Sequence, residues 1–174
     1  MRVEVAVGIG GEAGLAPVAT LWQADFGGKF SRMRDGEAAD LDGDGQSELV
    51  IATHDQGVVA LLRVRPGAAA EVVELDRQPD IFVHEVEVGD LDGDGTPEVY
   101  ATPSEPNRLD GTAQHGEVVR YVPAKGEGRA EVADLGTRHA KEILVADLDG
   151  DGRDELYVSV EAAEGGSVEV RRYE

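Results

Sequence analysis

Three short acidic segments hold the residues of this chain that could do chemistry. They read DLDGDGQSEL at 40–49, DLDGDGTPEV at 90–99 and DLDGDGRDEL at 147–156. Aligned, they place carboxylates at positions 1, 3, 5 and 9 of each copy: Asp40, Asp42, Asp44 and Glu48; Asp90, Asp92, Asp94 and Glu98; Asp147, Asp149, Asp151 and Glu155. Carboxylates this close together repel one another, and at alternating positions of a tight turn they are the ligands that a hard ion such as Ca²⁺ takes. The spacing therefore predicts calcium loops at 40–48, 90–98 and 147–155, with one Ca²⁺ in each and three in all.

The other loop positions agree with this interpretation. Glycines at positions 4 and 6 allow the backbone to curl around an ion without a clash from a Cβ atom. Position 7 varies, which is expected if its backbone carbonyl is the fifth protein ligand; the residues there are Gln46, Thr96 and Arg153. The alternative is an acidic, solvated turn without metal, and the recurrence of the same four acids in three copies argues against it.

An EF-hand shares the D-x-D-x-D-G pattern but requires a bidentate Glu at position 12 and a helix on each side. Position 12 is Ile51, Ala101 or Val158 in this chain, and none of these side chains can bind a metal. The residues after position 9 are β-branched or aromatic, which predicts a strand. The pattern therefore argues against EF-hands.

The three segments resemble the calcium loops of FG-GAP/VCBS repeats in integrin-alpha-like β-propellers, where D-x-D-x-D-G-x-x-[DE] joins the first two strands of a blade. The resemblance extends from about residue 26 to residue 172, and position by position it implies calcium at the twelve acids. Upstream, the Phe-Gly…Gly-Ala-Pro signature of the family is represented only by FGG at 26–28 and is missing before the other two loops. The resemblance implies a calcium-binding propeller.

The hydrophobic pattern predicts about thirteen short strands in one domain, residues 1–174. Two strands, at 2–7 and 18–24, precede the first loop. Each repeat then has a strand entering its loop (36–40, 86–90 and 143–147), one leaving it (48–53, 98–102 and 155–160) and a third (58–64, 117–122 and 167–172); the first two repeats add a fourth at about 71–76 and 130–134. Four antiparallel strands per unit, at spacings of 50 and 57 residues, are typical of propeller blades. We therefore predict an all-β fold, a β-propeller of about three four-stranded blades, with a solenoid or a stack of hairpins as the alternative.

Three blades form only an open arc, since closed propellers have typically four to eight. An open arc exposes apolar sheet faces and unpaired strand edges. We therefore expect completion by another propeller segment or by a second copy, two chains making a six-bladed ring. The last strand, SVEVRRY at 167–173, resembles the first, RVEVAV at 2–7, which favours the homodimer. Leu41, Leu91 and Leu148, inside the acidic loops, are expected to anchor the packing between blades.

The formal net charge of −20 restricts the partners of the protein. Three Ca²⁺ would return six positive charges and leave about −14, which still argues against nucleic acid or an anionic membrane. The chain has no run of 18 apolar residues for membrane insertion and no basic-then-apolar leader in residues 1–20. Because such loops fill most readily where calcium is abundant, we expect an extracellular or periplasmic location.

Blade topology places the turn after strand 1 on one face and the 2–3 and 4–1 connections on the other. By this count His54 and His115 fall in 2–3 connections and His84 and His139 in 4–1 connections, all opposite the calcium loops. The pairs Arg34-Asp35, His84-Glu85 and Lys141-Glu142 should stand at the top of each innermost strand. The longest insertion, 102–116, is rich in hydrogen-bonding groups. We predict that a protein or glycan ligand binds at His54, His84, Glu85, Arg108, His115 and His139; the alternative is ordinary surface loops without a ligand.

Two classes of function remain. The first is a calcium-stabilised module for binding or scaffolding. The alternative is a lyase or hydrolase with a site at the central axis, as in propellers of several families. The sequence contains no Gly-x-Ser-x-Gly elbow, no His-Glu-x-x-His motif and no phosphate-cradling Gly loop. Acids held ionised as calcium ligands are poorly suited to general acid catalysis, so we predict no catalytic residue and favour the binding module.

Overall fold

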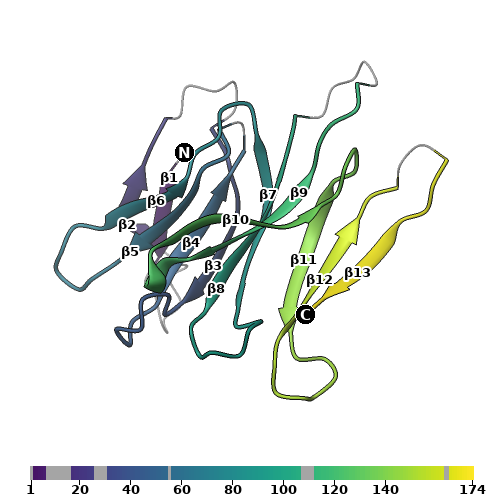
Figure 1. The fold of residues 1–174 in the computed structure, drawn as a ribbon. Helices are drawn as coiled ribbons and strands as arrows, with labels where there is room; N and C mark the ends of the chain where they lie inside the picture. Colours follow the sequence, from purple (N-terminus) through teal and green to yellow (C-terminus); the bar gives the residue numbers. More distant parts are fainter. Residues whose placement is uncertain (1, 7–16, 26–30, 55, 107–111, 163–164) are drawn as a thin grey trace, which may run out of the picture.

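A computed structural model describes residues 2–6, 17–25, 31–54, 56–106, 112–162 and 165–174. These residues form thirteen β-strands in four antiparallel sheets, with one 3₁₀ turn, η1 (Pro123–Lys125) (Figure 1). Within these ranges, no helix is long and apolar enough to cross a membrane. The all-β class and the strand number predicted from the sequence are confirmed.

The sheets follow one another in chain order, and neighbouring strands of a sheet are consecutive in the chain. A two-stranded sheet pairs β1 (Arg2–Ala6) with β2 (Pro17–Gln23). Blade 1 contains β3 (Met33–Ala39), β4 (Glu48–Thr53), β5 (Val59–Arg63) and β6 (Glu71–Asp76). Blade 2 contains β7 (Phe82–Gly89), β8 (Glu98–Ser104), β9 (Glu117–Val122) and β10 (Glu127–Asp134). Blade 3 contains β11 (Ala140–Ala146), β12 (Glu155–Val160) and β13 (Glu169–Tyr173).

The blades pack face to face, with β7 beside both β3 and β11, so these three strands are innermost. Because side chains alternate between the two faces of a strand, each blade contributes to two apolar layers. In β8, Val99 lies in the layer between blades 1 and 2, whereas Tyr100 lies in the layer between blades 2 and 3. Trp22 of β2 packs on the other face of blade 1, near Ile51. This arrangement is a partial β-propeller.

The three innermost strands are longer than the alternation predicts, and the sequence pattern explains why. They begin at residues 33, 82 and 140, three or four residues before the predicted starts. Each contains a register shift near its beginning, between Met33 and Asp35, between Val83 and Val86, and between Ala140 and Glu142. A bulge interrupts the two-residue alternation, so the residues before it do not continue the pattern. Each shift falls at one of the basic–acidic pairs, which do stand near the start of the innermost strands.

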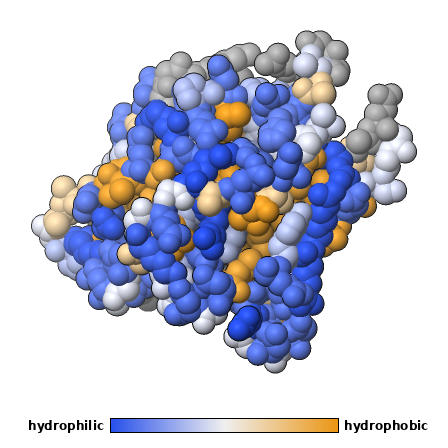
Figure 2. Space-filling model, in the orientation of Figure 1, coloured by the Kyte–Doolittle hydropathy of each residue, from blue (hydrophilic) through white to orange (hydrophobic). Residues whose placement is uncertain are grey.

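The far face of blade 3 is uncovered in the described part of the chain. Leu41 is fully buried between blades 1 and 2, and Leu91 packs between blades 2 and 3, as predicted. Leu148 is 62% exposed, so its predicted role as an anchor is wrong for this chain taken alone, because no sheet lies against it. Val168 and Val170, on blade 3, are also exposed. The face shown in Figure 2 is mostly hydrophilic, with apolar patches across the middle of the view.

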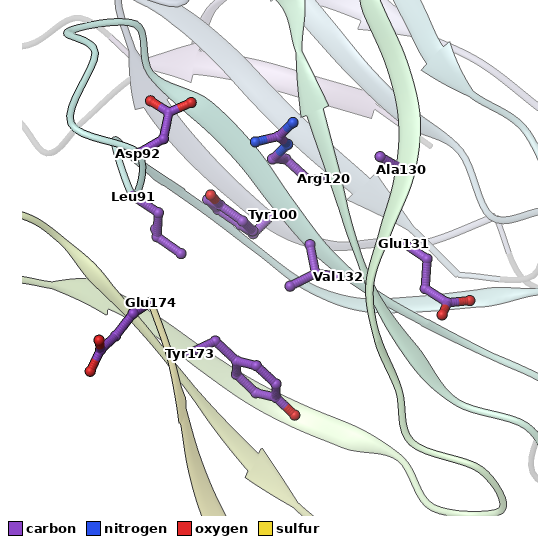
Figure 3. Close-up of a pocket in the computed structure, with 9 residues that line it drawn as sticks. All are labelled: Leu91, Asp92, Tyr100, Arg120, Ala130, Glu131, Val132, Tyr173 and Glu174. Atoms are coloured by element: carbon purple, nitrogen blue, oxygen red, sulfur yellow. The ribbon is translucent and has the colours of Figure 1, made fainter.

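Blade 3 has three strands among the described residues, whereas blade 2 has four. Strand β10 therefore has no counterpart opposite it. A cavity of about 360 Å³ lies between β10 and the end of β13, lined by residues that include Tyr100, Arg120, Val132 and Tyr173 (Figure 3).

Candidate functional site

The three acidic loops lie along one edge of the blades, at the lower side of the view in Figure 1. They join the first two strands of successive blades, β3 to β4, β7 to β8 and β11 to β12. Each strand pair ends in register at the loop, with Ala39 opposite Glu48, Gly89 opposite Glu98, and Ala146 opposite Glu155. The sheet geometry therefore presents the loops in equivalent positions.

The first Asp of each loop is fixed by backbone N–H groups. In the first loop Asp40 Oδ1 accepts from Gly43 at 2.8 Å and Asp44 at 3.0 Å, and Oδ2 accepts from Gly45 at 2.8 Å. Asp147 accepts three equivalent bonds, and Asp90 accepts two. These charge-assisted bonds curl the loop around the carboxylate and fix its position.

The curl depends on glycine. Positions 4 and 6 have positive φ in all three loops, for example 77° at Gly43 and 85° at Gly45, and side chains with a Cβ atom rarely adopt this conformation. The loops therefore have the conformation that the sequence predicts.

The Glu at position 9 is buried in every loop, and fixed partners orient it. Glu48, Glu98 and Glu155 are at most 3% exposed. Each accepts the backbone N–H of the Leu at position 2, at 3.0, 3.0 and 3.2 Å respectively. Each also meets an arginine: Arg65 at 3.0 Å from Glu48, Arg120 at 3.3 Å from Glu98, and Arg172 at 3.0 Å from Glu155.

In two of the loops, a tyrosine is a further partner of the position-9 Glu. The hydroxyl of Tyr100 donates to Glu98 at 2.8 Å, and that of Tyr157 donates to Glu155 at 2.9 Å. Tyr100 and Arg120 lie close to Leu91 and Asp92 of the second loop (Figure 3). Since a buried carboxylate needs hydrogen-bond donors, these partners hold the position-9 Glu in place.

Basic side chains also reach the outer oxygens of the loops. Arg65 Nη2 lies 2.8 Å from Asp44, Lys125 pairs with Asp94, and Arg172 Nη2 lies 2.6 Å from Asp149. The neighbouring cation lowers the pKa of Asp94 and of Asp149. These contacts relieve part of the repulsion among the acids.

Three acids in each of the first two loops, and all four in the third, converge closely enough to share one ion, whereas Asp44 and Glu98 lie outside their groups. Ligand atoms lie within 4.8 Å of one another in three groups: Asp40, Asp42 and Glu48; Asp90, Asp92 and Asp94; and Asp147, Asp149, Asp151 and Glu155. All are carboxylate oxygens, the donor type that fits a hard cation. The position-7 residues donate their N–H to the position-5 Asp, as in Gln46 to Asp44 at 2.8 Å; the equivalent donors are Thr96 and Arg153. The backbone carbonyls of these three residues remain predicted calcium ligands.

The histidines lie at the opposite ends of the strands. His54 follows β4 and stacks on Phe82, with ring centroids 3.6 Å apart. His115 precedes β9, is exposed, and lies 2.9 Å from Asp134. Both residues are in the predicted connections, whereas Arg108 lies outside the described residues. His54 and His115 are therefore the members of the predicted set that are accessible outside the strands.

The placement of His84 in a 4–1 connection is wrong. His84 belongs to β7, as Glu85 does, because the β-branched and aromatic run that forms this strand begins at Phe82. His84 is buried; its Nε2 lies 2.8 Å from Ser104 Oγ and 3.1 Å from Lys141 Nζ. His139 does precede β11, and its Nδ1 lies 3.3 Å from the same Lys141 nitrogen.

The environment at this end changes the ionisation of two β7 residues. Burial, together with the charges of Lys141 and Arg34, lowers the pKa of His84 to about 3. Burial and a hydrogen bond with Asp35 raise the pKa of Glu85 to about 8. The Ser104–His84 pair has the spacing of a nucleophile and its base, but an imidazole with so low a pKa is a weak base at neutral pH.

Sequence reasoning missed the residues that support the loops and the lysine between the histidines. One signal was available: Arg65 and Arg172 each lie 25 residues after the first Asp of their loops. Arg120 lies 30 residues after Asp90, because the 102–116 insertion lengthens that repeat. Lys141 lies six residues before the first Asp of its loop, as His84 does before Asp90, but no comparable spacing marks Ser104, which reaches His84 from another strand.

Comparison with known families identifies one of the repeats. Residues 40–101, from the first loop through β7 to the middle of β8, match the family described as FG-GAP-like repeat. No curated protein and no solved structure gives a significant match. The family match confirms the resemblance to FG-GAP/VCBS repeats.

Proposed function

We propose, on the premise that the chain carries an FG-GAP-like repeat, that it is a calcium-binding β-propeller module acting in binding or scaffolding. The observation that supports this most strongly is the set of three equivalent loops on one edge, each with its first Asp fixed by two or three N–H bonds. Loops arranged in this way lose little conformational entropy when an ion binds. Calcium would supply positive charge that neutralises the carboxylates of each loop.

Calcium titration with and without chelator tests the proposal. We expect three sites with dissociation constants of roughly 10⁻⁴ to 10⁻⁶ M, since no bidentate twelfth ligand is present. An ion that binds only the folded state stabilises it by about 2.7 kcal/mol per site at a hundredfold excess over the dissociation constant. The melting temperature should therefore rise with calcium and much less with equal magnesium. Coincident melting curves in chelator and in calcium would refute the proposal.

We further propose that the edge opposite the loops recognises a protein or glycan. His54 and His115 support this, because both lie outside the strands and His115 is exposed. The test is screening of glycan and peptide arrays in calcium, with wild type and His115→Ala compared. A partner captured equally by both proteins would exclude His115 from the binding surface, and a partner captured at the acidic edge would overturn the proposal.

We also propose that a second copy covers blade 3. Leu144 is 46% exposed and Leu148 62% exposed, although Leu41 and Leu91 at the same loop position as Leu148 pack between blades. Light scattering in calcium should give about twice 18.4 kDa. Leu144→Lys should return the particle to monomer mass, whereas Val64→Lys, at a 40% exposed residue directly after β5 of blade 1, leaves this face unchanged. If the wild type is a monomer at high concentration, the homodimer is refuted, and the remaining alternative is that another propeller segment covers blade 3.

An extracellular or periplasmic location follows from the same proposal. Sites with micromolar to millimolar affinity are filled where calcium is abundant, and they stay largely empty at resting cytosolic levels. Submicromolar affinity in the calcium titration would remove this argument.

A further inference from the structure

Lys141, at the start of the innermost strand of blade 3, has an unusual set of neighbours for a lysine. Its Nζ meets two imidazole nitrogens, His84 Nε2 at 3.1 Å and His139 Nδ1 at 3.3 Å. Within the described ranges, no carboxylate forms an ion pair with it. Lys125 is the contrasting case, since it pairs with Asp94 in the second loop. The chain has one further lysine, Lys29, outside the described residues.

The two imidazoles act as neutral acceptors. An ammonium group has only donors, so the ring nitrogens that face it must be unprotonated. The partners of Lys141 therefore bring no negative charge to balance its own. Burial lowers the pKa of Lys141; Glu161 acts in the opposite sense, and the charge of Arg34 adds to the lowering. At a given pH, a larger fraction of the Lys141 side chain is therefore the unprotonated amine than at a lysine held in an ion pair.

A cavity lies beside the Lys141 side chain. Lys141 lines a space of about 370 Å³ on the open face of blade 3. Its other walls are three valines, Val160, Val168 and Val170, of which the last two are 76% and 72% exposed, and three polar residues, Ser159, Glu161 and Glu169. The volume is that of a small-molecule site, and the walls suit an apolar body.

We propose that Lys141 is a reactive amine that binds small apolar aldehydes as a Schiff base. The amine nitrogen attacks the carbonyl carbon and forms a C–N bond. The carbonyl oxygen then leaves as water, with the two protons that the nitrogen loses, and an imine remains. The step needs no oxidant or reductant. His84 and His139 position the amine by accepting its N–H groups, and the step is independent of the calcium loops.

Trapping the imine tests this proposal on the full chain in chelator, at a concentration where light scattering gives a monomer, so that no second copy covers blade 3 and Lys125 keeps its ion pair with Asp94. The protein is incubated with 3-methylbutanal and cyanoborohydride, which reduces the imine to a stable secondary amine, and peptide mass spectrometry measures the label at each lysine. At about pH 7 we expect Lys141 to be labelled about tenfold faster than Lys125, which serves as the control within the same molecule. In urea the two rates should become equal, because the difference depends on the fold.

Two further measurements make the test decisive. The labelling rate at Lys141 should reach its plateau at a lower pH than the rate at Lys125. Glyceraldehyde, a polar aldehyde, should show less preference for Lys141, because it gains little from the valine walls. Equal rates at the two lysines, or the same plateau pH, would overturn the proposal. An equal preference for both aldehydes would overturn the assignment of the cavity.

Discussion

Replacing Asp40 by Asn separates two roles of the first residue in a calcium loop. Asp40 is a predicted ligand, and it also accepts three backbone N–H bonds at 2.8, 3.0 and 2.8 Å. Asn retains an oxygen for Gly43 and Asp44 but turns an NH₂ group toward the N–H of Gly45. Asp42 is the matched control, because it accepts only one N–H, at 3.2 Å, and pairs with Arg63 at 3.3 Å.

The two variants should differ in the absence of calcium. A hydrogen bond to a charged group contributes about 1.5–3 kcal/mol and a neutral one about 0.5–1.5 kcal/mol. Asp40→Asn loses one charged bond and weakens two, while water replaces part of the loss because the loop is exposed. We expect it to lower the free energy of unfolding by about 1–3 kcal/mol, and the melting temperature by about 2–4 °C per kcal/mol. Asp42→Asn should cost about 1 kcal/mol or less.

The assay is urea unfolding in chelator, followed by calcium titration of both variants. Each variant removes one negative charge from the same loop, so the relief of repulsion is common to both and cancels in the comparison. Calcium stoichiometry should fall from three to two in both. Equal destabilisation in chelator would refute the structural role of the three N–H bonds. Three sites remaining in either variant would refute the ligand assignment.

Two further perturbations test the blade packing and the axial carboxyl group. Gly89→Ala should destabilise by about 1–3 kcal/mol, because its Cβ would lie 2.0 Å from Val145 Cγ1, while Gly128→Ala, with no atom within 4 Å, should be neutral in thermal melts. In chelator, the contribution of Glu85 to stability should fall as pH rises from 4.5 to about 8, since folded Glu85 keeps a proton that the unfolded chain has lost; the contribution of His84, with its pKa lowered to about 3, rises with pH up to 6.5 and is common to wild type and variant. Glu85→Gln should flatten that pH profile in urea titrations.

Features set by local sequence could be predicted. The strands that leave the loops begin at Glu48, Glu98 and Glu155, as expected, because the alternation and the glycine turns are read within ten residues. The loop conformation was predictable for the same reason, since it depends on glycines and acids inside each loop. Blade order then followed from the repeat spacing.

Features set by contacts between blades could not be predicted. Lys141 contacts His84 across 57 residues of sequence. The other partner of His84, Ser104, lies on β8. The bulge in β7 interrupts the two-residue alternation after Val83, so the start of the strand could not be predicted. His84 was therefore assigned to a connection, although it is buried in the strand. Leu148 has the same sequence context as Leu41, and only the absence of a covering sheet in the described chain separates their burial. In each case the missing information is which strand lies opposite.

A bond between adjacent loops suggests that calcium binding at the second and third sites is linked. Asp154, at position 8 of the third loop, accepts the backbone N–H of Asp90, the first residue of the second loop, at 3.0 Å. Position 8 is Ser47 or Pro97 in the other loops. An ion that orders one of these two loops should therefore favour the bound form of its neighbour, with a coupling of about 0.5–1.5 kcal/mol, the contribution of one hydrogen bond. That corresponds to about a two- to tenfold change in affinity. Asp154→Ala should abolish the coupling in calorimetric titrations and leave the stoichiometry at three. Cooperativity that is the same in the variant and the wild type would show that the coupling runs through the shared core and not through this bond.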